Sequence, residues 1–131
     1  METKTVLVIE DNPLNLKLFR SLLHLGHYHV LEAEDAETGL KILQNHRPNL
    51  IIMDIQLPGM DGLTATGIIK SNPEIKDIPV VAMTAYAMEG DEQRALEGGC
   101  DEYMSKPIET KTFLNRIGKF MKGDATRTPP P

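Results

Sequence analysis

Cysteine is almost absent from this chain of 131 residues, which has Cys100 alone. A single cysteine excludes an internal disulfide and suits a reducing compartment. Long apolar runs are also missing, since no stretch approaches the roughly 20 residues that a membrane-spanning helix needs. The apolar run at 6–9 near the N-terminus is too short for the core of a signal peptide. These absences predict a cytoplasmic protein.

Basic residues are fewer than acidic ones, with 14 Lys and Arg against 19 Asp and Glu and a net charge of -5. The lysines and arginines form no stripe along the sequence. Nucleic-acid binding depends on neutralising phosphates, so we expect no direct contact with DNA or RNA. Neither glycine-rich phosphate loop, G-x-x-x-x-G-K-[ST] or G-x-G-x-x-G, occurs, which argues against a nucleotide-binding protein. A cation or a protein is the more plausible ligand.

Apolar runs typical of strands alternate along the chain with stretches typical of helices. The runs "VLVI", "LIIM" and "VVAM" are continuous, as in strands buried on both faces of a parallel sheet. The alternation predicts an α/β fold with a five-stranded parallel sheet flanked by five helices. The expected strands are 5–9, 29–33, 50–53, 80–83 and 102–104, and the expected helices are about 13–25, 36–45, 62–70, 88–97 and 110–121.

The first expected helix has clear start and stop signals. Asn12 is a suitable N-cap, Pro13 a preferred first residue, and Gly26 ends the helix. Its expected buried stripe consists of Leu14, Leu18, Leu22 and Leu25, with Phe19 beside it.

The last residues, "GDATRTPPP" at 123–131, are polar and rich in proline. This composition predicts a disordered tail after one domain at 1–122. A truncated linker, a native tail and a cloning remnant all remain open as its origin.

Asp54 ends the most apolar of the expected strands and is followed by the chain breakers of "QLPGMDG". Taken alone, Asp54 is most simply interpreted as a residue that caps the following loop. In an open parallel sheet, however, all strands end at one edge, where ligands bind. Four strand ends there form a coherent chemical set, whereas Glu34 and Asp35 after the second strand add nothing to it. The four ends supply Glu10 and Asp11, Asp54, Thr84, and Lys106 followed by Pro107.

Three of these residues are carboxylates, and carboxylates held together repel unless a cation intervenes. Mg²⁺ suits such a site because it takes few carboxylates and retains several waters. With Lys106 and a divalent ion, the three acids sum to no net charge, so a phosphoryl group can approach. The Thr84 hydroxyl can donate to a phosphoryl oxygen. The set therefore predicts formation of an aspartyl phosphate.

Four pieces, "VLVIEDN", "LIIMDIQLPGMDG", "PVVAMTAYA" and "CDEYMSKP", resemble in this order the receiver domain of two-component response regulators. The resemblance covers residues 4–122. It implies a flavodoxin-like, CheY-like sheet with strand order 2-1-3-4-5. It also implies a phosphoacceptor signalling domain rather than an enzyme, one that assists its own phosphorylation and dephosphorylation.

The resemblance assigns roles around the predicted metal site. Asp54 matches the phosphoacceptor. Glu10 and Asp11 match the acidic pair that holds Mg²⁺, Asp11 directly and Glu10 through water. Gln56 matches the position whose backbone carbonyl completes the metal site.

The resemblance also assigns a switch. Thr84 matches the switch hydroxyl, and Lys106 matches the lysine that pairs with the phosphoryl group. Tyr103 matches the aromatic residue that changes rotamer on activation, although a half-buried core aromatic is a second reading. The bond between Lys106 and Pro107 matches the family's cis peptide.

Within the family, "EDNPLNLKLF" and "TAYAMEGDEQRALEGGCDEYMSKPI" are similar to single-domain regulators of the alphaproteobacterial cell cycle and cell polarity. These proteins bind histidine kinases. The similarity implies a stand-alone regulator without an output domain, recruited to the cell pole by partners. Its targets would bind the face formed by the fourth helix, fifth strand and fifth helix. A receiver excised from a hybrid kinase or a larger regulator is the alternative.

Other chemistries fit less well. A phosphatase of the haloacid-dehalogenase type needs a second Asp two residues after its nucleophile, where this chain has Gln56. Zinc is not expected, because the spacing of the four histidines (24, 27, 29 and 46) suits surface positions better than a tetrahedral site. Cys100 is expected to pack as a small apolar residue.

Overall fold

The computed structural model describes residues 3–84, 90–105 and 110–126. Its strands are β1 Thr5–Ile9, β2 His29–Ala33, β3 Leu50–Asp54, β4 Val80–Thr84 and β5 Glu102–Ser105. Its helices are α1 Pro13–Leu25, α2 Ala36–Asn45, α3 Gly62–Ser71, α4 Asp91–Glu97 and α5 Thr110–Thr126.

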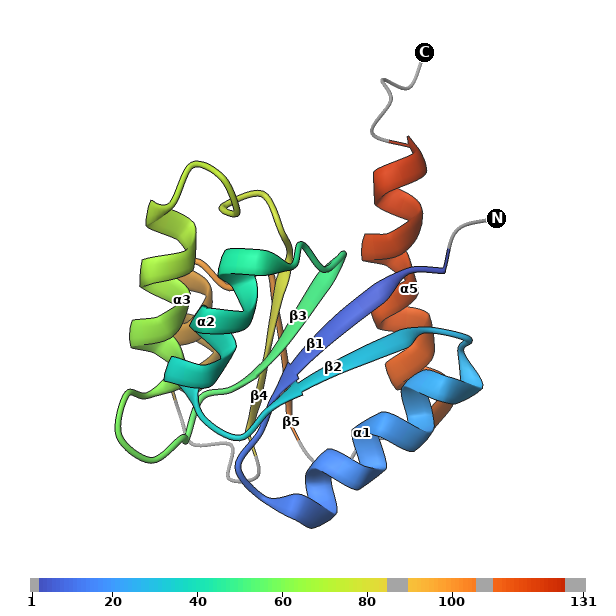
Figure 1. Ribbon diagram of the computed structural model, residues 1–131, viewed down its shortest axis with the longest axis horizontal. Helices are drawn as coiled ribbons and strands as arrows, with labels where there is room; N and C mark the ends of the chain where they lie inside the picture. Colours follow the sequence, from blue (N-terminus) through green and yellow to red (C-terminus); the bar gives the residue numbers. More distant parts are fainter. Residues whose placement is uncertain (1–2, 85–89, 106–109, 127–131) are drawn as a thin grey trace.

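The strands form one sheet in the order β2-β1-β3-β4-β5, and every neighbouring pair is parallel. Val8 lies opposite Ile52, and Ile52 opposite Val81, so the three central strands are in close register. Every residue of β3 and β4 is buried. The expected fold class and strand order are confirmed, and all five strands end at the same edge (Figure 1).

Helices cover both faces of the sheet. Helices α1 and α5 lie on one face and α2 and α3 on the other (Figure 1), where Ala95 of α4 joins the core as well. Under α1 and α5, the rings of Phe19 and Phe113 are 5.8 Å apart between centroids. Successive strand residues alternate between the two core clusters, Val8 facing α1 and α5 and Ile9 facing the other side. The apolar runs are continuous because alternate residues of each strand pack into the cores on opposite faces of the sheet.

Helix α1 buries a different stripe from the expected one. Asn12 caps it as predicted, its Oδ1 accepting the backbone N–H of Leu14 at 2.9 Å. The buried positions are Leu16, Phe19, Leu22 and Leu23. Leu14 and Leu25 are 76% and 64% exposed and Leu18 is 44% exposed, so the prediction was wrong at these three positions. Leucines occur on more than one side of this helix, and periodicity alone could not decide which side faces the sheet.

Several element ends also differ from expectation. Helix α4 is described from Asp91, after Gly90 with φ of 89°, and the earlier start expected at 88 lies outside the described residues. Helix α5 continues to Thr126 rather than ending at Met121, so 123–126 belong to a helix and not to a tail. No proline occurs between Thr110 and Thr126, and Gly123 alone costs a helix only about 1 kcal/mol. The expected disorder of 127–131 lies outside the described residues.

An ion pair holds α1 to the edge strand β2. Arg20 donates from Nε and Nη2 to the two carboxylate oxygens of Glu32, the Nη2 bond being 2.8 Å long. The bonds to Arg20 lower the pKa of Glu32 below its usual 4.5. A lowered pKa in the folded state means that the pair stabilises the fold above pH 4.5 and ceases to do so as the pH falls through the lowered value.

We therefore expect Glu32→Gln to be slightly less stable than the wild type at neutral pH. The difference should shrink as the pH falls below 4.5. Urea unfolding of both proteins across this range measures it. Both partners are partly exposed, so the effect is small. A difference that grew in acid would contradict the assignment.

None of the helices in the described part of the chain combines the length and the apolarity needed to cross a lipid bilayer.

Candidate functional site

Two acids follow β1 at the edge where the strands end. The backbone N–H of Glu10 donates to the carbonyl of Ala33 at 3.0 Å, which fixes the start of this loop beside β2. The Glu10 carboxylate is buried and accepts the N–H of Asn12 at 3.1 Å. Asp11 is exposed. The first acid is therefore buried, while its neighbour is exposed to solvent.

Asp54 is the last residue of β3 and is 6% exposed. Its Oδ1 accepts the backbone N–H of Gln56 at 2.9 Å, so the carboxylate does cap the following turn. An ionised carboxylate has two oxygens with about four acceptor positions between them, so one group can both cap a turn and take part in a cluster. The capping interpretation and the chemical interpretation of Asp54 are thus compatible.

Glu10, Asp11 and Asp54 meet in space, as the sequence predicted. A ligand atom from each can be chosen such that all lie within 4.8 Å of one another. Three carboxylate oxygens this close suit a hard divalent cation, and one buried, one nearly buried and one exposed acid suit Mg²⁺, which retains waters. Gln56 is exposed beside Asp54. Its predicted contribution through a backbone carbonyl remains a prediction.

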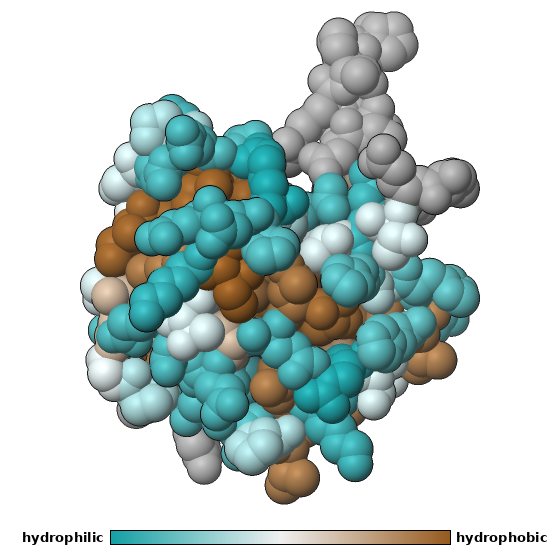
Figure 2. All heavy atoms as spheres, in the orientation of Figure 1, coloured by the Kyte–Doolittle hydropathy of each residue, from teal (hydrophilic) through white to brown (hydrophobic). Residues whose placement is uncertain are grey.

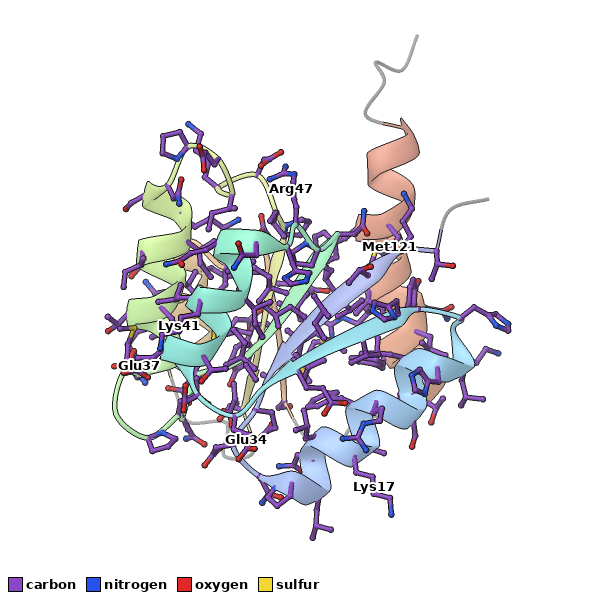
Figure 3. The ribbon with its side chains drawn as sticks, viewed as in Figure 1. Lys17, Glu34, Glu37, Lys41, Arg47 and Met121 are labelled. Atoms are coloured by element: carbon purple, nitrogen blue, oxygen red, sulfur yellow. The ribbon has the colours of Figure 1, made fainter. Side chains whose placement is uncertain are left out.

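The acids after β2 take no part in this group. Glu34 lies near the same edge of the sheet (Figure 3), but it does not belong to the three-carboxylate cluster. Asp35 caps α2 instead, its Oδ1 accepting the N–H of Thr38 at 2.7 Å. The separation of Glu34 and Asp35 from the chemical set agrees with the sequence analysis.

Thr84 ends β4 next to β3 and is fully buried. The register places Met83 opposite Asp54 and Thr84 opposite Ser105 of β5. Thr84 is therefore one strand away from the carboxylates at the same edge, where its predicted role requires it. Lys106 and Pro107, with their predicted phosphoryl contact and cis peptide, lie outside the described residues.

Tyr103 lies in β5, with its ring packed against the core under α2, α3 and α4. Its hydroxyl oxygen Oη is buried and has no hydrogen-bond partner among the described residues. Burial, with a smaller contribution from the charges of Asp91 and Glu92, raises the pKa of this hydroxyl. Tyr103 thus occupies an inward position, as both of the sequence interpretations allow.

Gly62 contributes to the site in a way that the sequence analysis missed. It begins α3, and a Cβ on this residue would lie 2.3 Å from the carbonyl oxygen of Asp54. The helix therefore packs directly against the backbone of Asp54, which only glycine allows. The signal in the sequence was the second glycine of "PGMDG", which the sequence analysis interprets as a chain breaker and as the start of a helix but not as a packing contact.

The remaining predictions concern residues away from the site. All four histidines are exposed, as expected for surface positions. Cys100 is buried, and its Sγ lies 3.7 Å from the hydroxyl of Thr66. Burial raises the pKa of the Cys100 thiol, so it packs as a neutral group.

Known proteins are similar to this chain in sequence over nearly their whole length. "Polar-differentiation response regulator DivK" of Brucella anthropi is 45% identical over 122 residues, which cover 93% of this chain and 98% of that protein. DivK of Brucella abortus is 45% identical over 123 residues, or 94% and 99% of the two chains.

Solved structures of receiver domains have a similar fold. The receiver domain of a Pseudomonas aeruginosa sensor histidine kinase, which has a magnesium ion in its active-site cleft, matches with a TM-score of 0.85 and 27% identity, over 92% of this chain and 99% of the other. A CheY-like receiver domain of Methanospirillum hungatei matches with a TM-score of 0.85 and 26% identity, over 95% and 98%.

The sequence profile described as "Response regulator receiver domain" matches residues 6–118. That range spans β1 to the middle of α5 and includes all of the predicted site residues. The chain belongs to the receiver domain family of two-component response regulators.

Proposed function

We propose that this receiver accepts a phosphoryl group on Asp54 from a histidine kinase or a phosphotransfer protein and signals by binding other proteins. The convergence of Glu10, Asp11 and Asp54 within 4.8 Å carries the proposal. The resemblance to DivK supports a regulator of the cell cycle or of polarity, located in the cytoplasm and recruited to the pole by partners.

In the proposed step, a carboxylate oxygen of Asp54 attacks the phosphorus of a phosphohistidine. An O–P bond forms, the N–P bond breaks, and the imidazole keeps the departing electron pair and takes up a proton. Mg²⁺, held by Glu10, Asp11 and Asp54 and by the backbone carbonyl of Gln56, supplies positive charge to the phosphoryl oxygens when bound. Hydrolysis of the acyl phosphate by water at the same site returns the free carboxylate.

Two surfaces suit protein partners. Exposed leucines of α1 (Leu14, Leu18 and Leu25) begin close to the acids that follow β1. Lys17 extends from the same helix away from the sheet (Figure 3), and brown surface is visible along α1 in Figure 2. A phosphodonor bound over α1 would therefore be near Asp54. Target proteins would contact the face of α4, β5 and α5, where Tyr103 lies.

Incubation with Mg²⁺ and acetyl phosphate, followed by intact mass spectrometry, tests the proposal. We expect an acid-labile mass increase of one phosphoryl group that requires Mg²⁺. Binding of beryllofluoride, a phosphoryl analogue, should show the same dependence on Mg²⁺. A protein that neither gains the adduct nor responds to beryllofluoride would have a receiver fold but no phosphoacceptor function.

Lys106→Ala is expected to separate metal binding from the switch. Mg²⁺ should bind with nearly unchanged affinity, since the acids that hold it are intact. The response of Tyr103 to beryllofluoride should be lost, because no cation draws the end of β5 toward the phosphoryl group. Calorimetry measures the first effect and NMR of the tyrosine rings the second. A normal Tyr103 response in this variant would argue against the proposed role of Lys106.

The alternative is a receiver from a hybrid kinase or a larger regulator. The chain spans nearly the whole length of its DivK relatives but also matches a kinase receiver domain. Sequencing the intact gene product distinguishes the two.

A further inference from the structure

Both edge strands of the sheet are tied to a helix by an arginine–glutamate pair. Arg20 of α1 pairs with Glu32 of β2, and Arg116 of α5 pairs with Glu102 of β5. The two pairs are similarly exposed, with side-chain exposures of 43% and 28% for the first and 35% and 27% for the second. Helices α1 and α5 lie on the same side of the sheet (Figure 1). The protein thus contains two chemically matched links at opposite edges.

The link at β5 has an additional bond. Arg116 donates from Nε to Oε2 of Glu102 at 2.8 Å and from Nη2 to the backbone carbonyl of Tyr103 at 3.1 Å. Within the described residues, Arg20 bonds the Glu32 carboxylate alone. The Arg116 guanidinium thus bonds both a side chain and the main chain of the edge strand, through charge-assisted hydrogen bonds. Arg116 therefore holds the main chain of β5 at Tyr103 itself.

The ring of Tyr103 lies on the other face of the strand from Arg116. It packs with the core under α2, α3 and α4, whereas Met104 packs with the core under α1 and α5. Its buried Oη has no hydrogen-bond partner among the described residues. Burying a hydroxyl without a hydrogen bond costs free energy, which disfavours the inward position. The inward position of the ring consequently depends on packing and on where the backbone of β5 is held.

We propose that Arg116 is a positioning residue of the phosphorylation switch, holding the backbone of β5 from α5 so that Tyr103 keeps its inward position. This inference rests on the proposed function and adds that phosphorylation of Asp54 favours the inward position of Tyr103. Loss of the Arg116 bonds would free the strand and populate outward positions of the ring. By linkage, a phosphoryl analogue that favours the inward ring would then bind more weakly.

Arg116→Gln, measured by ¹⁹F NMR of protein labelled with 3-fluorotyrosine, tests this inference. The chain has 3 tyrosines, and Tyr103→Phe identifies the Tyr103 signal. Each variant is titrated with beryllofluoride in excess Mg²⁺. We expect the Tyr103 signal of unliganded Arg116→Gln to shift toward that of an exposed ring. The beryllofluoride concentration at half-response should rise roughly fivefold.

Two further variants separate positioning from general stability. Arg20→Gln removes the matched pair at β2 and should lower the melting temperature without changing the beryllofluoride titration. Glu102→Gln keeps the bond from Arg116 to the Tyr103 carbonyl and should show the same changes as Arg116→Gln, but smaller. An Arg116→Gln titration equal to that of wild type would overturn the inference. A wild-type protein without any beryllofluoride response would instead overturn the proposed function, and with it the switch role of Arg116.

Discussion

Replacing Asp54 by asparagine is expected to abolish phosphorylation completely while leaving the fold intact. An amide is not a nucleophile toward phosphorus, and no acyl phosphate can form on it. Asparagine retains an Oδ1 that can accept the backbone N–H of Gln56, as Oδ1 of Asp54 does in this turn. Intact mass after treatment with Mg²⁺ and acetyl phosphate should show no adduct. Circular dichroism should show the helix content of the wild type.

The same substitution should change how the protein responds to Mg²⁺. Without the ion, Asp54→Asn removes repulsion among three neighbouring carboxylates, and two unit charges about 4 Å apart in water repel by about 1 kcal/mol. The variant should therefore be as stable as the wild type or slightly more stable in the absence of Mg²⁺. With Mg²⁺, the wild type should gain more stability, since it binds the ion through more carboxylates. Melting temperatures at several Mg²⁺ concentrations measure both effects.

Asp77→Asn is a suitable control for this experiment. Asp77 is an exposed acid that pairs with Arg47 before β4, at the opposite end of the sheet from Asp54. The Asp77→Asn variant should be phosphorylated on Asp54 and should respond to Mg²⁺ as the wild type does. An adduct on the Asp54→Asn protein, or a Mg²⁺ response unchanged by that substitution, would show that another residue is the phosphoacceptor.

The sequence predicted the grouping of the strand-end acids, because that grouping depends largely on topology. In a parallel sheet every strand ends at one edge, so Asp54 and Thr84 had to lie at the same edge as the acids after β1 whatever the packing of the helices. Glu10, Asp11 and Asp54 indeed form one cluster. The strand order was not derivable in this way and came from the family resemblance, which the observed order confirms.

Features that depend on packing could not be predicted from patterns. In α1, Phe19 and Leu22 are buried as predicted. The prediction was wrong for leucines 14, 18 and 25, because they are as apolar as the buried ones at 16 and 23. The pairing of Arg116 with Glu102 joins residues 14 positions apart in the chain, in a strand and a helix. No local periodicity indicates that contact. It becomes visible once α5 is placed against β5.

Gly62→Ala is expected to damage both stability and function although it adds a single methyl group. The new Cβ would lie 2.3 Å from the carbonyl oxygen of Asp54 and 2.7 Å from the Cα of Ile55. Both are backbone atoms and cannot move aside as a flexible side chain would. Either α3 or the end of β3 must shift, and overpacking of this kind costs about 1–3 kcal/mol. Urea unfolding measures the loss.

The position of the clash makes the effect on phosphorylation specific. Because the obstructing atom belongs to Asp54 itself, relief of the clash displaces the phosphoacceptor relative to Glu10 and Asp11. The rate of phosphorylation by acetyl phosphate should therefore fall even under conditions in which the variant is fully folded. A misplacement of the reacting group by a fraction of an ångström is enough to slow a reaction that depends on positioning.

Gly67→Ala supplies the matched control within the same helix. A Cβ at Gly67 meets no atom within 4 Å, so the substitution adds no clash. Alanine is favoured over glycine in a helix by about 1 kcal/mol, so this variant should be more stable than the wild type and phosphorylated at the same rate. Opposite changes in stability for two identical substitutions in α3 would locate the effect in the contact between Gly62 and Asp54. Equal stabilisation by both would show that the end of β3 yields without cost and that Gly62 is not required there.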